Sequence, residues 1–310
     1  MIVFRGIPIE AKENIALTIG NFDGVHIGHQ AMIKRICKKA AELGVASAVM
    51  IFEPQPREFF DINNPPPRLT SLKAKLKILK ETEIDRVYIV RFDDVFSRIE
   101  AKDFVNVILK KIRVVSLLVG DDFRFGAKRM GDFSLLRKLS SKETFMLESM
   151  PSLEHQGIRV SSTYVRRSLT EGKMALSKAL LGRYYTIAGR IVKGDGVGRK
   201  LGYPTANIDL KGRRVALNGI FAVRLVWDHR PPLKGVASLG VRPTVKDKGN
   251  LLLEINIFDF NEIIYGKYVT VEFLQKIRDE EKFGSVDQMV VQMALDVRLS
   301  RKFFDKRNEN

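Results

Sequence analysis

The sequence predicts two domains of different fold class. Residues 1–182 are expected to form an α/β domain with a parallel sheet, including a linker helix, and residues 183–310 a small antiparallel β-barrel with a closing helix. A chain of 310 residues is long enough for two hydrophobic cores. Short apolar runs alternate with helical patterns before residue 183, whereas short β-like runs separated by Gly, Pro and Asp turns follow it.

The first half alternates between two sequence periods. Its short apolar runs indicate strands buried on both faces, and helical patterns between them, such as the stripe that ends before Gly44, complete βα units. This alternation predicts a parallel sheet with right-handed crossovers and a ligand site beyond the carboxyl ends of the strands. The expected strands are 15–19, 46–52, 86–90, 114–119 and 144–147, the helices include 33–40, 72–79 and 104–112, and the site segments are 20–29, 52–56, 92–94 and 120–126.

The second half begins after a predicted helix at residues 168–180 that joins the two domains. Its β runs are short and turn-bounded, which is typical of a small barrel. A closing helix follows, with Ser285 and Gln288 as a capping box. The expected strands are 184–192, 219–226, 233–239, 251–260 and 268–274, and the buried stripe of the closing helix is Val286, Met289, Val290, Met293 and Val297.

The net charge of +17 raises the question of nucleic-acid binding. The two predicted domains carry +9 and +8, so the charge is spread along the chain rather than gathered in one arm. A diffuse positive field suits small anionic substrates such as nucleoside triphosphates, and we expect no nucleic-acid partner. No apolar run approaches the ~18 residues that span a bilayer, and the N-terminus lacks a signal pattern, so we expect no membrane association.

The single cysteine, Cys37, cannot form an internal disulfide, which fits a reducing compartment and a cytoplasmic protein. Cys37 lies on the apolar stripe of a predicted helix, so packing is its expected role. No feature of the sequence indicates an oligomeric state.

The segment 20–30 contains His26 and His29 where the first predicted strand gives way to a helix. A helix N-terminus presents free N–H groups and partial positive charge to phosphate, and two imidazoles there can donate to oxygens that gain charge during attack on an α-phosphate. Gly28 lets backbone and nucleotide approach closely, and Asn21 and Asp23 lie in the preceding turn. The alternative is a turn and a capped helix with two incidental histidines.

The segment 161–166 opens a later predicted helix with Ser162 and Thr163 in its first positions. Hydroxyls there are explained equally well as N-caps. Arg166 lies near the same helix start and can reach a β- or γ-phosphate as a fixed cation. Together with the His-x-Gly-His segment, this arrangement is similar to that of the nucleotidyltransferase superfamily.

The segment Pro204-Thr205-Ala206-Asn207 follows a glycine-rich approach. A hydroxyl and an amide carbonyl are hard oxygen ligands that suit Mg²⁺, and the glycines permit a loop that lies over phosphates. The alternative is an ordinary barrel loop. Strand alternation places Glu254 opposite the apolar face of its strand, either as a solvated residue or as a base that accepts a proton from an attacking alcohol. Two phosphate-handling sites in series indicate two consecutive reactions on one metabolite.

Over almost its whole length the chain resembles the bifunctional prokaryotic riboflavin kinase / FAD synthetase family. The motifs occur in the order typical of that family and are highly specific in combination. They are 20–30, 52–56, 120–126, 161–166, 181–183, 198–207, Glu254 with Asp259-Phe260, Tyr265-Gly266 and 277–283.

The resemblance implies a Rossmann-like nucleotidyltransferase domain, a riboflavin kinase-like barrel and two reactions. The barrel would transfer the γ-phosphoryl group of ATP to riboflavin, giving FMN and ADP, and the first domain would transfer AMP from ATP to FMN, giving FAD and pyrophosphate. Neither needs a covalent enzyme intermediate, so positioning, Mg²⁺ and cationic stabilisation should carry the rate. By position, the resemblance implies Glu254 as kinase base; Thr205 and Asn207 for Mg-ATP; His26, His29, Asp122, Ser162, Thr163 and Arg166 for adenylyl transfer; further ATP contacts at Asn21, Asp23, Gly28 and Gly198; and flavin contacts at Pro56, Asp122 and Phe125.

Two other functions are compatible with the sequence. One is an enzyme in which only one module is catalytically active and the other only binds ligand. Intact motifs at both sites argue against this alternative. The other is an RNA-binding protein on a synthetase-like fold. That protein would gather basic and aromatic residues on one face, whereas the charge here is diffuse.

Overall fold

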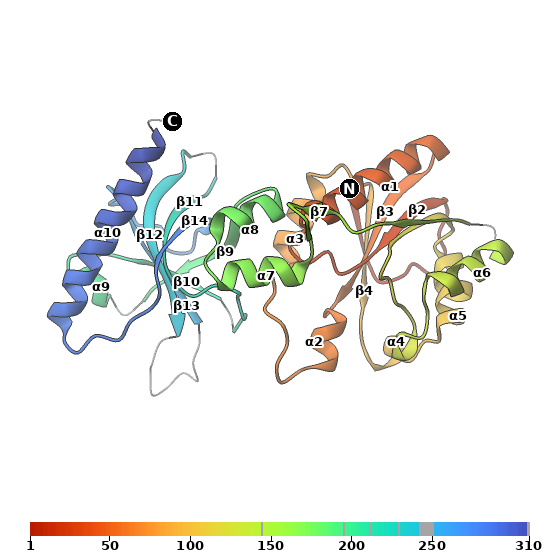
Figure 1. The fold of residues 1–310 in the computed structure, drawn as a ribbon, viewed down its shortest axis with the longest axis horizontal. Coiled ribbons are helices and arrows are strands. Elements are labelled where there is room, and N and C mark those ends of the chain that lie inside the picture. Colours follow the sequence, from red (N-terminus) through yellow and green to blue (C-terminus); the bar gives the residue numbers. More distant parts are fainter. Residues whose placement is uncertain (144, 195, 211, 229, 242–250, 309–310) are drawn as a thin grey trace. The chain divides into compact units, whose positions relative to one another are not determined.

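The computed structural model describes residues 1–308, with gaps at 144, 195, 211, 229 and 242–250. The chain forms two compact units (Figure 1). The first consists of residues 1–66 and 71–162, and the second of residues 67–70 and 163–310. The segment 163–182, expected as part of the first domain, therefore groups with the second unit.

The first unit is built on a six-stranded sheet in which every pairing is parallel, as predicted. The edge strand β1 was not predicted, because its four residues are too few to show a sequence period, and most of its side chains are exposed. The strand predicted at 144–147 lies further along the chain: β6 begins at Met146 and pairs with β5 as far as Met150. Thr144 lies outside the described residues. The sheet order is β1 (Ile2–Arg5), β4 (Arg86–Arg91), β3 (Ala46–Glu53), β2 (Ile15–Ile19), β5 (Val114–Gly120), β6 (Met146–Met150).

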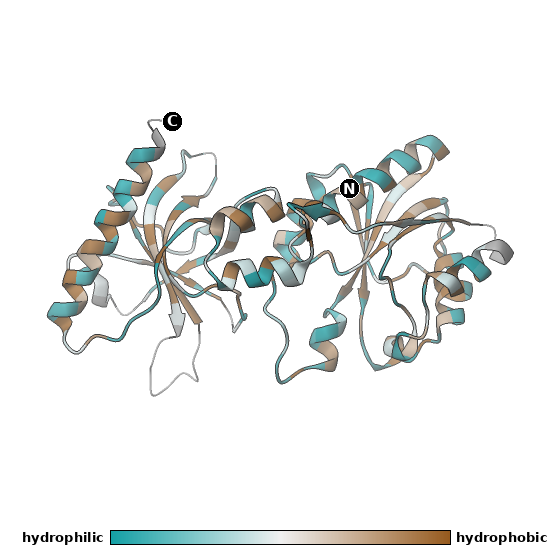
Figure 2. Cartoon of the chain, viewed as in Figure 1, coloured by the Kyte–Doolittle hydropathy of each residue, from teal (hydrophilic) through white to brown (hydrophobic). Residues whose placement is uncertain are grey.

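Helices cover both faces of this sheet, and the strands between them are the most hydrophobic part of the unit (Figures 1 and 2). Helix α1 (Ile27–Leu43) ends at Gly44 in a left-handed conformation, as its sequence predicts. The predicted helix at 104–112 is a short α5 (Ala101–Asp103) that continues as a π-helix, η1 (Phe104–Leu109). The remaining elements are α2 (Pro56–Phe60), α3 (Leu72–Lys80), α4 (Asp94–Ser97), η2 (Ala127–Arg129), α6 (Phe133–Glu143) and the hairpin β7 (Glu154–His155)–β8 (Ile158–Arg159).

The prediction of a single linker helix at residues 168–180 is wrong. Two helices, α7 (Ser162–Thr170) and α8 (Met174–Leu181), take its place and meet at a turn around Gly172, whose φ is +69°. That left-handed glycine stops the first helix, and the apolar period continues on both sides of the break. The hydroxyls of Ser168 and Ser177 hydrogen-bond at 2.7 Å, so the two helices pack together.

The second unit contains a closed barrel of six antiparallel strands, as predicted for the C-terminal half. One strand, β10, was not predicted, because its four residues follow a proline-containing loop and carry a polar side chain in the middle. Around the barrel the strands run β10 (Ala206–Asp209), β13 (Leu251–Ile257), β12 (Leu233–Val241), β11 (Gly219–Val226), β14 (Tyr268–Arg278) and β9 (Tyr185–Val192), with a short helix α9 (Val197–Lys200) before β10.

The closing helix α10 (Val286–Asn308) packs on the outside of the barrel, against β11, β12 and β14. The predicted capping box forms only in part. Ser285 Oγ accepts the Gln288 N–H at 3.2 Å, but the Gln288 side chain accepts from Gly284 rather than from Ser285. Val286 was wrongly predicted as buried: it is 58% exposed.

Candidate active sites

His26 and His29 lie at the N-terminus of α1, beyond the carboxyl end of β2. His26 is the N-cap, and its Nδ1 accepts the His29 backbone N–H at 3.3 Å. The two imidazole rings stack with their centroids 3.6 Å apart and an interplanar angle of 15°. A Cβ at Gly28 would lie 3.3 Å from His26 Nδ1, so glycine leaves the ring room at this helix start. Two imidazoles are thus held together where helix N–H groups point outward.

A small cavity of about 210 Å³, which we call the histidine cavity, opens beside these rings. Its lining includes His26, Gly28 and His29 together with residues from the end of β5 and from the segment before α7. Asp122 and Ser162, both predicted site residues, line it as well. Asn21 and Asp23 do not: they lie in the turn that precedes the helix, where Asp23 is 1% exposed.

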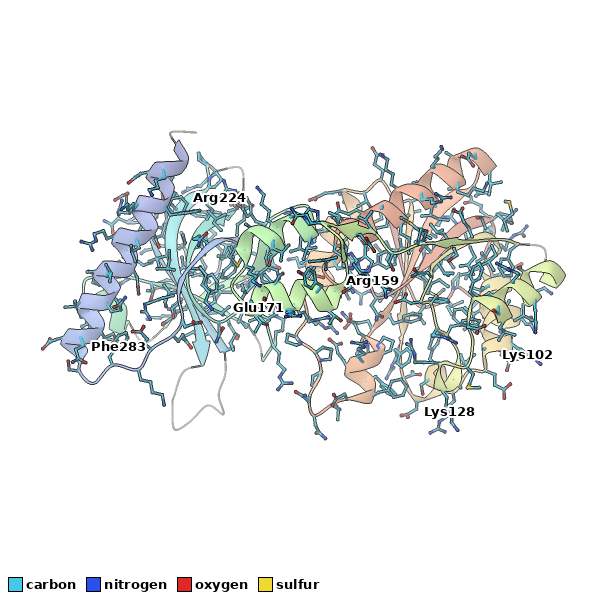
Figure 3. The ribbon with its side chains drawn as sticks, in the orientation of Figure 1. Lys102, Lys128, Arg159, Glu171, Arg224 and Phe283 are labelled. Atoms are coloured by element: carbon cyan, nitrogen blue, oxygen red, sulfur yellow. The ribbon has the colours of Figure 1, made fainter. Side chains whose placement is uncertain are left out.

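Arg159, on the hairpin strand β8, is a residue of this cavity that sequence reasoning missed (Figure 3). Its guanidinium contacts Asp122 Oδ2 at 2.6 Å and Asp121 Oδ1 at 3.7 Å, and Ser152 Oγ donates to Asp121 Oδ1 at 3.0 Å. Burial opposes ionisation of Asp121, but the Ser152 hydrogen bonds and Arg159 together lower the pKa of this carboxyl. The sequence contained a signal for this ion pair, because two aspartates follow a predicted strand and an arginine precedes the serines of segment 161–166.

The predicted residues of α7 divide between the two units. Ser162 belongs to the first unit, where its hydroxyl donates to the Asp23 carbonyl at 2.9 Å. Thr163 and Arg166 belong to the second unit, and Arg166 Nε donates to the Pro67 carbonyl at 2.6 Å. Ser162 thus holds the turn before α1, which the N-cap interpretation of the hydroxyls did not anticipate.

A larger cavity of about 540 Å³, the aromatic cavity, adjoins the same stretch of chain. The segment 120–126 serves both: its first three residues line the histidine cavity, and its last four line the aromatic one. Phe123 and Phe125 stack at 5.6 Å, and Pro56 is also in the wall. Planar aromatic ligands suit such walls, and a cavity this size is typical of small-molecule sites. Its other lining residues include Phe52, Phe60, Phe92, Phe96, Phe104 and the cations Arg57, Arg124, Lys128 and Arg129.

In the barrel, Asn207 on β10 lies directly opposite Glu254 on β13. Leu253 and Ile255 are fully buried on the inner face, so Glu254 and Asn256 project to the other face, as strand alternation predicts. Asn256 Nδ2 donates to the Pro204 carbonyl at 2.9 Å and so fixes the loop that carries Thr205.

The loop that precedes β10 is shaped around Thr205 and Asn207. A Cβ at Gly198 would meet the Tyr203 carbonyl oxygen at 2.5 Å, and one at Gly194 would collide with the Asn207 amide. Asn207 is 6% exposed, and its Oδ1 has no hydrogen-bond partner among the residues that the structure describes. A buried amide oxygen in that state, two positions after a threonine, fits Mg²⁺ held with nucleotide phosphates.

Two cavities also meet in the barrel unit. The Glu254 cavity, of about 200 Å³, is lined by Thr205, Glu254, Asn256 and one side of the closing helix. The Tyr265 cavity, of about 560 Å³, lies between the β10 approach and the loop 260–265. Thr205 lines both cavities. The predicted stripe residues Met289, Met293 and Val297 therefore serve as a cavity wall, which is why they are only partly buried.

A buried ion pair ties the closing helix to the barrel at the Glu254 cavity. Arg278, the last residue of β14, donates to both Asp296 oxygens at 2.8 and 2.7 Å, and Gln292 donates to the same carboxylate at 3.0 Å. The hydrogen bonds to Asp296 raise the pKa of the Arg278 guanidinium. The Arg278 guanidinium also lies 5.7 Å from the centroid of the Phe283 ring. Figure 3 labels Phe283, which comes shortly before the start of α10. Burial raises the pKa of the neighbouring Glu280 carboxyl, and Arg278 opposes that rise.

We expect Asp296→Ala to destabilise the barrel unit by about 3–5 kcal/mol, because the Arg278 guanidinium would be left buried without its partner. The side chains of Arg278 and Asp296 are 16% and 6% exposed, so water can replace little of the loss. Denaturant unfolding of the full chain measures the change, with the exposed Asp305→Ala on the same helix as control. Equal unfolding curves for the two variants would show that the pair contributes nothing to stability.

The part of the chain that the structure describes contains no group of three or more His, Cys, Asp or Glu placed to hold a metal ion. Nor does any described helix have the length and apolar character that crossing a membrane requires.

Comparisons with known proteins match the two parts of the chain to two different families. A family model described as FAD synthetase matches residues 9–164, and one described as riboflavin kinase matches residues 181–304. A relative from Escherichia coli (strain K12), named bifunctional riboflavin kinase/FMN adenylyltransferase, is 42% identical over 294 residues, which are 94% of each chain. A relative of the same name from Haemophilus influenzae is 40% identical over 94% of this chain and 95% of its own.

A solved structure is also similar over nearly the whole length. It is described as a macrolide-efflux protein from Streptococcus pneumoniae, and it superposes with a TM-score of 0.84 at 28% identity, covering 97% of this chain and 99% of that one. The two-unit architecture is therefore shared with a chain of known structure.

Proposed function

Because the chain belongs to the bifunctional riboflavin kinase/FMN adenylyltransferase family, we propose that it phosphorylates riboflavin to FMN with ATP and then adenylylates FMN with a second ATP to give FAD and pyrophosphate. The observation that carries this proposal is the pairing of cavities. In the barrel, the Glu254 cavity and the Tyr265 cavity share Thr205 in their walls. In the first unit, neighbouring residues of segment 120–126 line the histidine cavity and the aromatic cavity. A transfer between two bound substrates requires neighbouring cavities of this kind.

In the barrel, we assign riboflavin to the Glu254 cavity and ATP to the Tyr265 cavity. Thr205 stands where the two meet, so the γ-phosphoryl group would lie between the ribityl hydroxyl and Thr205. Glu254 accepts the proton of that hydroxyl as its oxygen attacks phosphorus. Asn207, across the ladder from Glu254, and Gly198, which closes the loop over Thr205, complete the phosphate side of the site.

Magnesium is part of this proposal. Thr205 and Asn207 would hold the ion, which neutralises phosphate charge when it is bound with ATP. The buried Asn207 oxygen supports the assignment.

In the first unit, we assign FMN to the aromatic cavity and ATP to the histidine cavity. The phenylalanines and Pro56 offer faces for the flavin ring, and segment 120–126 leads from that ring to the histidines. His26 and His29 donate to the α-phosphate oxygens as the FMN phosphate attacks and pyrophosphate leaves. We also propose that Gly28, Asp122 and Ser162 contact the ATP side and that Asn21 and Asp23 act through the turn that they form.

The proposal includes the setting in which the enzyme works. Its substrates and products are the small molecules riboflavin, FMN, FAD, ATP, ADP and pyrophosphate, with no nucleic-acid partner, and we place the reactions in the cytoplasm. The test is to incubate the purified protein with ATP, Mg²⁺ and riboflavin and to separate the flavins by chromatography. We expect FMN to form first and FAD to follow. Accumulation of FMN without FAD would show that only the kinase is active. Absence of both FMN and FAD would contradict the proposal.

We also propose that the functional boundary lies at residue 182, so that residues 183–310 contain the complete kinase site. A fragment of residues 163–310 is expected to convert riboflavin to FMN and to make no FAD. The fragment 183–310 should retain this activity but unfold at a lower temperature, because it lacks α8, whose Leu180 and Leu181 are buried. Chromatography and thermal unfolding check the two expectations. A folded 163–310 fragment that cannot phosphorylate riboflavin would contradict the domain assignment.

A further inference from the structure

The turn between β2 and α1 is held in an unusual backbone conformation. Phe22 and Val25 have positive φ values of 46° and 40°, and Gly24 has a φ of 80°. Two non-glycine residues in the left-handed region within four positions are costly, and such turns persist only where their surroundings over-determine them. His26, the N-cap of α1, follows this turn directly.

Three side chains donate to alternate carbonyls of the turn. Lys75 Nζ lies 2.6 Å from the Asn21 oxygen, Ser162 Oγ lies 2.9 Å from the Asp23 oxygen, and Gln30 Nε2 lies 2.8 Å from the Val25 oxygen. The donors come from three different elements: α3, the start of α7 and α1. A turn tied at every second carbonyl cannot relax without breaking one of these bonds.

Lys75 is the unusual member of the three, because its side chain is fully buried at 0% exposure. Burying an ammonium group is expensive unless it is hydrogen-bonded and compensated, and groups of this kind gather at functional sites. Lys75 does not line the histidine cavity. Its influence on that cavity therefore passes through the turn.

The turn determines where the histidine rings lie. Phe22, inside the turn, packs on His29 with ring centroids 4.8 Å apart, and His29 in turn stacks on His26. A shift of Phe22 would remove the support behind His29. A displacement of about 1 Å in a reacting group can cost ~10²-fold in rate.

We propose that Lys75 and Gln30 are positioning residues for adenylyl transfer, which hold turn 21–25 so that His26 and His29 keep the geometry that the reaction needs. The proposal rests on the function assigned to the first unit. It assigns a role in that reaction to Lys75, which lies outside the sequence motifs, and to Gln30, which lies in segment 20–30 but was given no role there.

The test uses Lys75→Met in the full-length protein, with Lys77→Met as the matched control, since Lys77 is an exposed lysine on the same helix. We expect kcat for FMN adenylylation to fall on the order of 10²-fold in Lys75→Met. The KM values for ATP and FMN should stay within about threefold, because the residue touches neither substrate. Riboflavin phosphorylation by the same molecules should match wild type, as should both activities of Lys77→Met.

Gln30→Glu keeps the proposal testable if Lys75→Met fails to fold. This change removes the donor to the Val25 carbonyl at nearly constant size, and it should also lower kcat for adenylylation at least tenfold while the kinase activity persists. Wild-type adenylylation in both variants, or in Gln30→Glu alone if the other does not fold, would overturn the positioning role. An equal loss of both activities in folded protein would overturn it too. Absence of adenylylation in wild type would instead contradict the proposed function.

Discussion

Replacing Glu254 by glutamine is expected to lower the turnover of riboflavin phosphorylation by about 10²–10⁴-fold, because glutamine cannot accept the proton of the attacking hydroxyl. Glu254 lines the cavity that Thr205 also lines, and it faces away from the apolar interior of the barrel. The substitution keeps size and polarity, so the strand and its pairing should be unchanged. The measurement is the kinase rate at saturating ATP and riboflavin.

The internal control is adenylylation of supplied FMN, whose proposed histidines lie in the other unit. That activity should remain at the wild-type level in Glu254→Gln. Kinase turnover within a few-fold of wild type would remove Glu254 from the mechanism and support its interpretation as a solvated strand residue. The phosphate-side residues would then act by positioning alone.

The complementary expectation concerns His29→Ala, which should slow FMN adenylylation by about 10²–10³-fold, equivalent to ~2.7–4 kcal/mol of lost charge stabilisation. The histidine lies at the N-terminus of α1, where it stacks on His26. Alanine also suits the first turn of a helix, so α1 should persist. Steady-state rates of FAD formation from FMN and ATP measure the effect.

Riboflavin phosphorylation by His29→Ala should be nearly intact. A parallel loss of both activities would indicate misfolding or a shared site, and would contradict the assignment of one reaction to each unit. Circular dichroism and thermal unfolding of the variant distinguish these two explanations.

Sequence periodicity predicted the strands of five or more residues and missed the shorter ones. The run 15–19 appears unchanged as β2, whose five residues are all buried. By contrast, β1 is an exposed edge strand, and β10 carries the polar Asn207 between apolar neighbours. Short strands of this kind are specified by their partners, which a single sequence does not display.

Some site residues could be predicted from local sequence motifs, whereas others could be recognised only from the fold. Histidines and hydroxyls next to glycines were visible as motifs, because their chemistry is local. Lys75 was not visible, since its helix reads as an amphipathic segment with several lysines, and only the fold shows which of them is buried. The interpretation of Ser162 also depended on the fold, because its acceptor, Asp23, lies 139 positions away.

The pairing of Asn207 with Glu254 also sets limits on how this chain can vary in length during evolution. These residues are cross-strand neighbours, and side chains alternate between the two faces of a strand. Insertions in the connections between strands leave that pairing untouched. One residue inserted within β13 ahead of Glu254 would send its carboxylate into the barrel interior, among Leu239 and Phe273, and bring Leu253 out in its place. Homologous chains that keep kinase activity should therefore show gaps in their loops and none inside this pair of strands.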